Sequence, residues 1–393
     1  MDETIDPKWL ERQRRILAGR AAAGGGGTEG AGGLESMGGE GDLPHPDDVL
    51  GRVDRMIREM PAREIGEEKE VRKALETLFS HGRPALAKLG GGPALSPDEG
   101  VALEAIVETD GSRPSFLLDQ GLPPLAHPFL GEWEGAMLTA REPVRKVAEA
   151  VGRVQPTGGS AANFVGSATL FQSDPPRALT NYHVLDDARK HGIAVAIEDR
   201  KAKVGPGLEV DFIGEAASFE SNCFKVTGAD LPENYGRGFG RVDAAVLHLE
   251  AADPDALPTP FGTFSALAAY ATGGAASLCT IGFPGPPNVK SSGEVDWNWV
   301  IATLFNNLFG YKRLAPGKFL QGLGSHGSDT IKVAMSHDAT TFGGASGSLV
   351  LAWLDPGAPA FGLHFAGITG EANYMVSTAK AAAALRDIGV PVQ

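Results

Sequence analysis

The chain has 393 residues, of which 42% are hydrophobic, and its 49 acidic and 35 basic side chains give a formal net charge of −14. A length of this kind predicts two or three folding units of roughly 100–200 residues each. The acidity argues against nucleic-acid binding, which favours a basic face, and the lack of an apolar run of about 18 residues argues against a transmembrane helix.

The first part of the chain is predicted to be disordered and then helical. Residues 1–45 lack the apolar core of a secretory signal, and the glycine-rich run at 21–42 has almost nothing to bury. Residues 46–149 carry apolar side chains at helical spacing, with an N-cap signature, Ser-Pro-Asp-Glu, at 96–99. We expect these helices to form a regulatory or partner-binding region, and the chain to be cytoplasmic and without membrane contact.

The pattern changes near residue 150. A short strand at 115–119 and a helix at about 132–150, which Pro143 could restart, lead into this second region. Apolar runs bounded by Gly, Pro and Asp then predict strands within 164–171, 178–185, 193–198, 243–250, 278–283, 331–336, 346–353 and 361–369. Short strands at such spacing indicate an all-β sandwich or barrel.

The two cysteines, Cys223 and Cys279, allow either one disulfide or two reduced thiols. A secreted domain held together by disulfides normally carries more cysteines. We therefore favour two reduced, buried thiols.

Ser346 lies in the glycine-rich sequence Gly-Gly-Ala-Ser-Gly-Ser, which suits a nucleophile. Gly344 and Gly347 allow the chain to turn tightly around the serine, so that the amides of Gly344 and Ser346 can point into one oxyanion hole. The alternative is an ordinary Gly-Ser loop.

His183 and Asp243 are the candidate partners of this serine. His183 ends the apolar run 178–185, where it could hold an imidazole at a sheet edge, although a structural histidine is the alternative. Asp243 begins the apolar run 243–250, and a carboxylate there is costly to bury unless it is paired. A histidine Nδ1–H would justify its burial, whereas a turn or strand-cap aspartate is the alternative.

Four sequence elements occur in the order that a known family uses. TNYHV at 180–184, VDAAVL at 242–247, IGFPG at 281–285 and GASGS at 344–348 resemble the corresponding elements of bacterial trypsin-like serine peptidases. The His, Asp, Ser order is that of the chymotrypsin-type triad. The resemblance covers about residues 151–393.

This resemblance implies a mainly β fold, a chymotrypsin-like double six-stranded β-barrel over residues 150–393. It implies His183, Asp243 and Ser346 as the catalytic triad, a protein or peptide substrate, and no metal or cofactor. One position departs from the family, because Ala345 stands where Asn or Asp is usual. In animal trypsin-like zymogens that Asp pairs with a newly cut N-terminal amine, and Ala345 cannot form that ion pair.

The expected specificity pocket resembles that of glutamyl endopeptidases. The segment GLHFAG at 362–367 is similar to their GIHWGG segment, and Thr341 matches their pocket threonine. A partly protonated His364 beside that hydroxyl could bind a substrate carboxylate. Thr340 occupies the pocket base, where an Asp would select Arg or Lys. We therefore expect a preference for acidic residues, the alternative being that His364 is a packing histidine.

Three further points stay open at this stage. The aromatic segment 288–324 is either a helical insertion packed on the second barrel or an exposed substrate wall. A catalytically silent peptidase fold that serves as a binding scaffold is the main rival function. An α/β-hydrolase esterase fits poorly, because the serine lies in G-x-S-x-S and the triad order differs.

Overall fold

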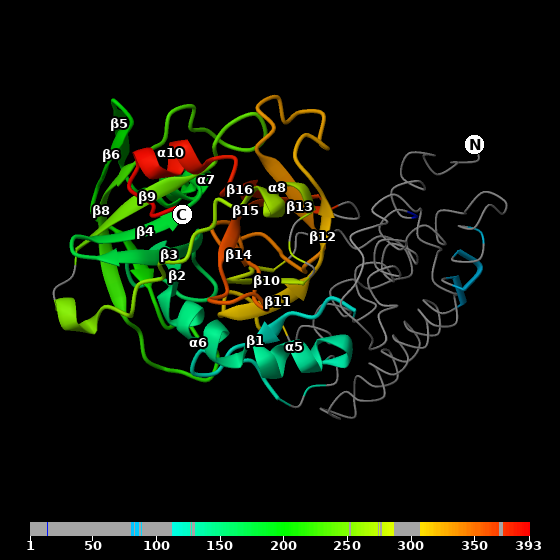
Figure 1. Ribbon diagram of the computed structural model, residues 1–393. Helices are drawn as coiled ribbons and strands as arrows, with labels where there is room; N and C mark the ends of the chain where they lie inside the picture. Colours follow the sequence, from blue (N-terminus) through cyan, green and yellow to red (C-terminus); the bar gives the residue numbers. More distant parts are fainter. Residues whose placement is uncertain are drawn as a thin grey trace, which may run out of the picture.

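The computed structural model describes residues 112–286 and 307–393, apart from 126, 128–129, 251–252, 274, 276 and 369–371, together with residues 14, 80, 81, 83–85 and 88. Within these residues strands predominate and helices are short (Figure 1). The predicted glycine-rich linker and Trp297, Trp299 and Phe305 of the aromatic segment lie outside the described residues, as do most of the predicted helices before residue 112.

The first sheet closes on itself. It contains β2 (Val151–Pro156), β3 (Gly166–Ser173), β4 (Pro176–Thr180), β5 (Val195–Glu198), β6 (Lys201–Val204), β7 (Leu208–Asp211), β8 (Cys223–Asp230) and β9 (Ala245–Glu250). The strand order is β5-β6-β8-β7-β2-β3-β4-β9, and β9 pairs again with β8. Strands β7, β2, β3, β4, β9 and β8 therefore form a six-stranded barrel.

The second sheet follows the first in sequence. It contains β1 (Phe116–Leu117), β10 (Leu278–Gly282), β11 (Arg313–Gly317), β12 (Phe319–Gln321), β13 (Ala334–His337), β14 (Leu349–Leu351), β15 (Ala360–Ile368) and β16 (Ala372–Ser377). Its order is β1-β11-β10-β14-β15-β16-β13-β12. Only Lys318 separates β11, the second strand of this order, from β12, the last, so one continuous segment runs from one side of the sheet to the other. The predicted mainly β, double-barrel fold is confirmed.

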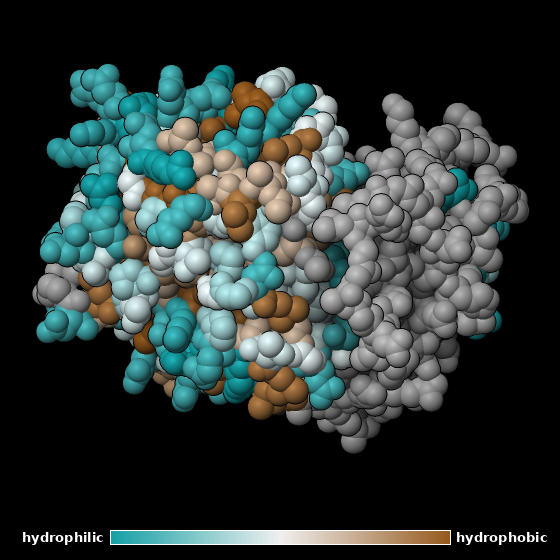
Figure 2. Space-filling model, viewed as in Figure 1, coloured by the Kyte–Doolittle hydropathy of each residue, from teal (hydrophilic) through white to brown (hydrophobic). Residues whose placement is uncertain are grey.

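Residue patterns explain these strands. In β6, which lies between β5 and β8, Lys201 and Lys203 are exposed whereas Ala202 and Val204 are buried, the period of two that a half-solvated strand requires. Strands β10 and β11 are buried along their whole length, including Arg313 at the start of β11. The surface over the β5 and β6 hairpin is correspondingly hydrophilic (Figure 2).

Residues 112–150, here called the strap, pass over the second sheet before entering the first. The strap contains β1, which pairs with β11, then η1 (Gly131–Trp133), α5 (Glu134–Thr139) and α6 (Arg141–Ala150). The helix predicted at 132–150 is therefore two α-helices that meet at Ala140. Pro143 lies in the first turn of α6, where its missing N–H leaves no helical hydrogen bond unmade.

The other helices are α7 (Tyr182–Asp187), η2 (Ala188–His191), η3 (Pro254–Ala256), α8 (Ala268–Gly273) and α10 (Ala382–Asp387). Helix α10 follows β16 but returns to the first barrel, where Asp387 pairs with Arg200 (Figure 1). The C-terminal segment thus connects the two barrels.

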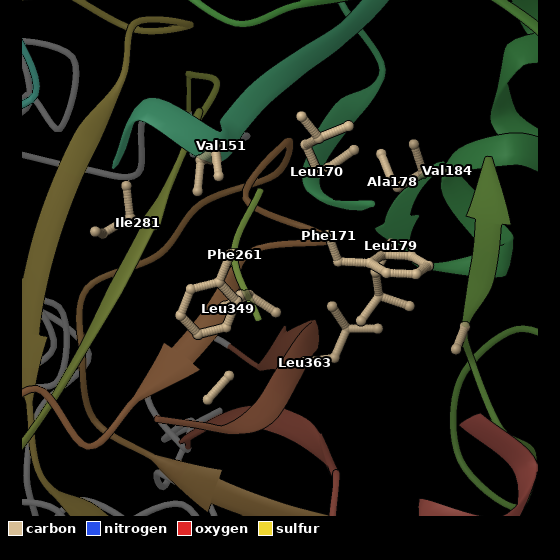
Figure 3. Packing of buried hydrophobic residues seen from close by; sticks show 14 of the residues in the cluster. Val151, Leu170, Phe171, Ala178, Leu179, Val184, Phe261, Ile281, Leu349 and Leu363 are labelled. Atoms are coloured by element: carbon tan, nitrogen blue, oxygen red, sulfur yellow. The ribbon is translucent and has the colours of Figure 1, made fainter. Parts of the chain in front are cut away.

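One apolar cluster extends through both barrels and the strap. Figure 3 shows Leu170 and Leu179 of the first sheet near Leu349 and Leu363 of the second, and all four are fully buried or nearly so. Trp133 of the strap belongs to the same cluster. Shared burial of this kind fixes the two barrels against each other, because separating them would expose this apolar surface to water.

Both cysteines are free thiols, as we favoured. Cys279 is buried, but Cys223 is exposed, so the expectation of two buried thiols is wrong for Cys223. It begins β8, whose alternate residues face solvent.

Candidate active site

His183 is delivered by a helix rather than by a strand end. Strand β4 ends at Thr180, Asn181 has extended backbone angles, and α7 begins at Tyr182. The sequence analysis placed the His183 imidazole at the end of a strand, whereas in the structure His183 lies in the first turn of α7. Val184 and Leu185 anchor α7 because they are buried. The His183 side chain is 12% exposed and contacts Asp243.

Asp243 is fully buried, and its carboxylate accepts three hydrogen bonds. His183 Nδ1 lies 2.8 Å from Oδ2, the His183 backbone N–H donates to Oδ1 at 3.1 Å, and the Gly238 N–H donates to Oδ2 at 2.9 Å. An ionised carboxylate can only accept, so the proton of the neutral ring resides on Nδ1 and leaves Nε2 as an acceptor. This is the tautomer that a general base for a serine requires.

Two residues that the sequence analysis did not single out complete this arrangement. Asn181 donates from Nδ2 to the Asp243 carbonyl at 2.6 Å, which joins the end of β4 to the start of β9. Gly238 has a φ of +74°, a conformation that favours glycine. Only the Asn of the TNYHV element was visible in the sequence; the Gly238 amide comes from a loop that carries no local signal for this role.

Ser346 is half-buried in the loop between β13 and β14. The Ala345 N–H donates to the Phe342 carbonyl and the Ser348 N–H to the Ala345 carbonyl, both at 3.0 Å, so two successive turns surround the serine. Gly344 and Gly347 have φ values of +92° and +89°. The predicted tight turn around Ser346 is thus present, and its backbone requires glycine at both positions.

The glycines are also required by space. A Cβ at Gly344 would lie 2.5 Å from Phe164 Cε2, and one at Gly347 would lie 1.9 Å from the Ser167 carbonyl oxygen. The loop is therefore pressed directly against β3 of the first barrel.

Ser167 of β3 is the residue that anchors this loop, and the sequence analysis missed it. Its N–H donates to the Ser346 carbonyl at 2.8 Å, and its hydroxyl donates to the Gly344 carbonyl at 3.1 Å. The same hydroxyl accepts from the Phe283 N–H at 3.0 Å. The available sequence signal was a serine within an apolar run predicted to form a strand, because a buried hydroxyl needs hydrogen-bond partners.

The loop of Ser346 and helix α7 of His183 both contact β3 and β4. The Ser167 carbonyl accepts from the Thr180 hydroxyl at 2.7 Å, and Thr180 precedes His183 by three residues. The Gly347 N–H donates to the His364 carbonyl at 3.0 Å, and His183 acts electrostatically on the His364 ring. In the described part of the chain, Ser346 Oγ has no hydrogen bond to His183, a contact that often tightens only with substrate bound.

The amides of Gly344 and Ser346 remain available to a ligand. Among the hydrogen bonds of the described residues, neither of these two N–H groups donates to another protein atom. Their neighbours Ala345, Gly347 and Ser348 all donate within the protein. Two unused donors beside a serine hydroxyl are the arrangement expected of an oxyanion hole.

The expected pocket residues occupy adjoining positions but are already hydrogen-bonded. The Thr341 hydroxyl donates to Asn373 Oδ1 at 2.6 Å, and Asn373 Nδ2 donates to the Ala339 carbonyl at 2.7 Å. The Thr340 hydroxyl donates to the Arg113 carbonyl. Asn373 and Arg113 are thus neighbours of the pocket loop that the sequence did not reveal.

His364 is buried on β15 beside a second buried histidine. Its ring Nδ1 lies 3.4 Å from Nε2 of His337. Burial, with smaller effects of His337 and His183, holds the pKa of His364 well below its ordinary value, and burial lowers the pKa of His337 to about 3. The His364 imidazole is therefore neutral near pH 7, and the expectation of a partly protonated ring is wrong. His337 is the last residue of β13.

The part of the chain that the structure describes shows neither a metal site nor a membrane-spanning helix. Among the described residues, no group of three or more His, Cys, Asp or Glu side chains is arranged to hold a metal ion. Within the same residues, every helix is too short or too polar to span a bilayer.

Comparison with known proteins gives one extensive match. No protein-family model matches the chain. A "probable serine protease" of Lysobacter enzymogenes is 42% identical over 385 residues, which cover 97% of this chain and 99% of that protein. The active form of the Rv3671c protease of M. tuberculosis matches at 16% identity and a TM-score of 0.37, covering 64% of this chain and 86% of that one.

A serine endoprotease of Yersinia pestis matches at 18% identity and a TM-score of 0.36, over 63% of this chain and 65% of that one. Structural likenesses at this level add little, whereas the sequence match extends over nearly the whole of both chains. On the strength of that match, the chain belongs to the serine proteases.

Proposed function

We propose that the protein is a trypsin-like serine endopeptidase in which Ser346, His183 and Asp243 act as the catalytic triad. The observation that carries the proposal is the fully buried Asp243 carboxylate, which accepts the His183 Nδ1–H at 2.8 Å. A buried carboxylate paired with a neutral imidazole fixes the ring tautomer and stabilises the imidazolium that forms when the ring takes a proton. The glycine-bounded loop of Ser346 lies beside the same strands.

In the first half of the reaction, Ser346 Oγ attacks the scissile carbonyl carbon and His183 Nε2 takes the hydroxyl proton. Negative charge then develops on the carbonyl oxygen, and the amides of Gly344 and Ser346 hydrogen-bond to it. Each such donor contributes about 3–4 kcal/mol of transition-state stabilisation. Collapse of the tetrahedral intermediate breaks the C–N bond, and the proton on His183 passes to the leaving amine.

In the second half, water hydrolyses the acyl-enzyme on Ser346. His183 takes a proton from the water, hydroxide adds to the ester carbonyl, and the returning proton regenerates the Ser346 hydroxyl as the carboxylic acid leaves. In this mechanism Asp243 does not take the proton; it orients the ring and stabilises the imidazolium.

We extend the proposal to a preference for acidic residues before the scissile bond, with Thr341 and His364 as substrate-binding residues and Thr340 at the pocket base. Thr341 adjoins Asn373, whose side chain lies near Gly367 of the pocket strand. Because His364 is neutral, it would contact a substrate carboxylate by hydrogen bonding rather than by charge. A neutral site of this kind would give a moderate preference, since its donors lack the positive countercharge that an ion pair with the carboxylate would supply.

A fluorophosphonate probe tests the catalytic part of the proposal. The wild-type protein should become labelled, whereas Ser346→Ala should not. His183→Ala should reduce cleavage of a labelled protein substrate by several orders of magnitude. Equal labelling of the wild type and Ser346→Ala would contradict the proposal and favour a silent peptidase fold that acts as a binding scaffold.

Cleavage-site profiling in a denatured peptide library tests the specificity part separately. Cuts should follow Glu or Asp more often than other residues, and Thr341→Val should weaken that preference. Predominant cleavage after Arg or Lys would refute the acidic preference while leaving the triad proposal intact.

A further inference from the structure

The loop from Asp338 to Gly344 leads from β13 to the nucleophile and carries both pocket threonines and one expected oxyanion donor. It lies outside the strands, so its conformation depends on tertiary contacts. The residue before the nucleophile, Ala345, is buried and its methyl group can form no ion pair. If an ion pair holds this loop in place, residues other than Ala345 must therefore form it.

Arg113, from the beginning of the strap, supplies such a contact. Its Nε lies 2.8 Å from Oδ2 of Asp338, and the two side chains are only 1% and 2% exposed. The Arg113 carbonyl also accepts the hydroxyl hydrogen of Thr340. A single residue, more than 200 positions before the loop in sequence, thus fastens it at two points.

Arg113 is itself held by groups outside the loop. Its Nη1 donates to Glu132 Oε1 at 3.0 Å and to the Ser112 carbonyl at 2.8 Å, and its guanidinium lies 5.2 Å from the ring centroid of Trp133. Trp133 Nε1 in turn donates to the Ser112 carbonyl at 2.9 Å. These contacts orient the guanidinium independently of the loop, as a positioning residue requires.

The opposite side of the loop is held by the second barrel. Asp338 Oδ1 accepts from the Lys318 N–H at 2.6 Å, and the Asp338 N–H donates to the Lys318 carbonyl at 3.1 Å. Asn373 of β16 binds Thr341 and the Ala339 carbonyl. The loop is therefore clamped between the strap and the barrel, and the Arg113–Asp338 ion pair is the buried charged part of the clamp.

We propose that Arg113 is a positioning residue for this serine protease: through its buried ion pair with Asp338 and its carbonyl bond to Thr340, it holds the loop that presents the Gly344 amide and the pocket wall. This inference rests on the proposed function. Removing the guanidinium leaves a buried carboxylate without its countercharge, and such a group moves toward water. That movement would draw the loop away from the nucleophile, and a displacement of about 1 Å in a catalytic group can cost about 100-fold in rate.

The test compares three variants of the full chain by their second-order rate constants for labelling with an alkyl fluorophosphonate. Arg113→Met keeps the apolar stem and removes the charge, and we expect labelling to slow by about 100-fold. Arg113→Lys restores a positive charge and should label at least about tenfold faster than Arg113→Met. Its recovery should be incomplete, because the lysine ammonium is a single point charge and lacks the planar set of donors of arginine. Arg177→Met is the matched control, because Arg177 pairs with Asp230 in the first barrel at 3.1 Å, outside the clamp. It should label at the wild-type rate.

Amide hydrogen exchange supplies a readout that does not need catalysis. It is measured in the Ser346→Ala background, with and without Arg113→Met, at a temperature where circular dichroism shows both proteins folded. We expect faster exchange confined to residues 338–348, with β3 and β4 unchanged, because local opening raises exchange only in the segment that opens. If the wild type fails to label at all, the proposed function fails, and this exchange measurement still decides the role of Arg113.

Either of two results would overturn the inference. One is an Arg113→Met protein that is folded and labels within about threefold of the wild type, since a merely stabilising residue would give that. The other is unchanged exchange over residues 338–348. If Arg113→Met does not fold, Asp338→Asn and Thr340→Val each remove one half of the contact and must show the same two effects in smaller measure.

Discussion

Replacing Asp243 by Asn tests the carboxylate–imidazole pair most directly. The carboxylate now accepts from three N–H groups, two of His183 and one of Gly238. An amide has only one acceptor oxygen, so its NH₂ must face at least one of these donors. If the NH₂ replaces Oδ2, it faces the ring and drives the proton from Nδ1 to Nε2, which can then no longer accept from Ser346.

The expected loss is about 10⁴-fold in kcat, which corresponds to about 5.5 kcal/mol of transition-state stabilisation. The assay is cleavage of a fluorescently labelled protein substrate, together with the rate of fluorophosphonate labelling. Substrate binding should change little, since Asp243 is fully buried and does not reach the substrate. The loss should therefore appear in kcat rather than in KM.

Asp211→Asn is the matched control, because Asp211 is a second buried carboxylate of the first barrel. It accepts from the N–H groups of Ile213 and Asn222 at 3.1 and 3.0 Å and pairs with Arg153 at 3.2 Å. Its replacement should destabilise the fold by about 3 kcal/mol and leave turnover of the folded fraction near wild type. A folded Asp243→Asn protein within about tenfold of the wild-type rate, a loss of only about 1.4 kcal/mol, would refute the assigned role of the carboxylate.

Three further predictions concern the supports of the site. Gly347→Ala should lower the free energy of unfolding by more than about 2 kcal/mol, because the added Cβ would clash with the Ser167 carbonyl. Gly158→Ala is the control: its added Cβ meets open space, so it should cost only about 1 kcal/mol. Urea unfolding measures both changes. Ser167→Ala should lower the rate of fluorophosphonate labelling about fivefold, since it removes the hydrogen bond from the hydroxyl to the Gly344 carbonyl, a loss of about 1 kcal/mol. An unchanged rate would contradict the anchoring role. Burial lowers the pKa of Lys312 to about 8 from 10.5. Between these values only the unfolded chain holds the proton, so stability should rise with pH by about 3 kcal/mol in all, and Lys312→Met should lack that rise when unfolding is compared at pH 8 and 10.

Most of the strand pattern was predictable because each strand carries its own apolar run. The predicted segments contain β5, β9, β10 and β14 and overlap β3, β4, β13 and β15. The error at residues 178–185 has a local cause: the segment is apolar on both sides of Asn181, so its composition gave no sign that α7 begins at Tyr182. Apolar runs of that length do not distinguish a strand from a short helix.

The candidate site was predictable only in part. The sequence pointed to His183 and Asp243 because each is a polar residue within or beside an apolar run, where burial is costly without a partner, and to Ser346 because glycines flank it. It did not indicate Ser167, Gly238 or the Arg113 contact, since their partners lie far away in the chain. The pocket histidine was identified, but its neutral state follows from burial against His337.

By itself, the sequence determined which chemical groups the protein has and the order in which they occur: an imidazole, a carboxylate and a hydroxyl between short β-strands, with glycines at the turns that need them. Only the tertiary structure decided how those groups are supported. The third donor to Asp243, the strap that reaches the pocket loop, and the protonation of His364 all depend on contacts between residues distant in sequence and on the exclusion of water around them. Hydrogen bonds and buried charges of this kind are properties of the closed barrels, so no local pattern of residues could have specified them.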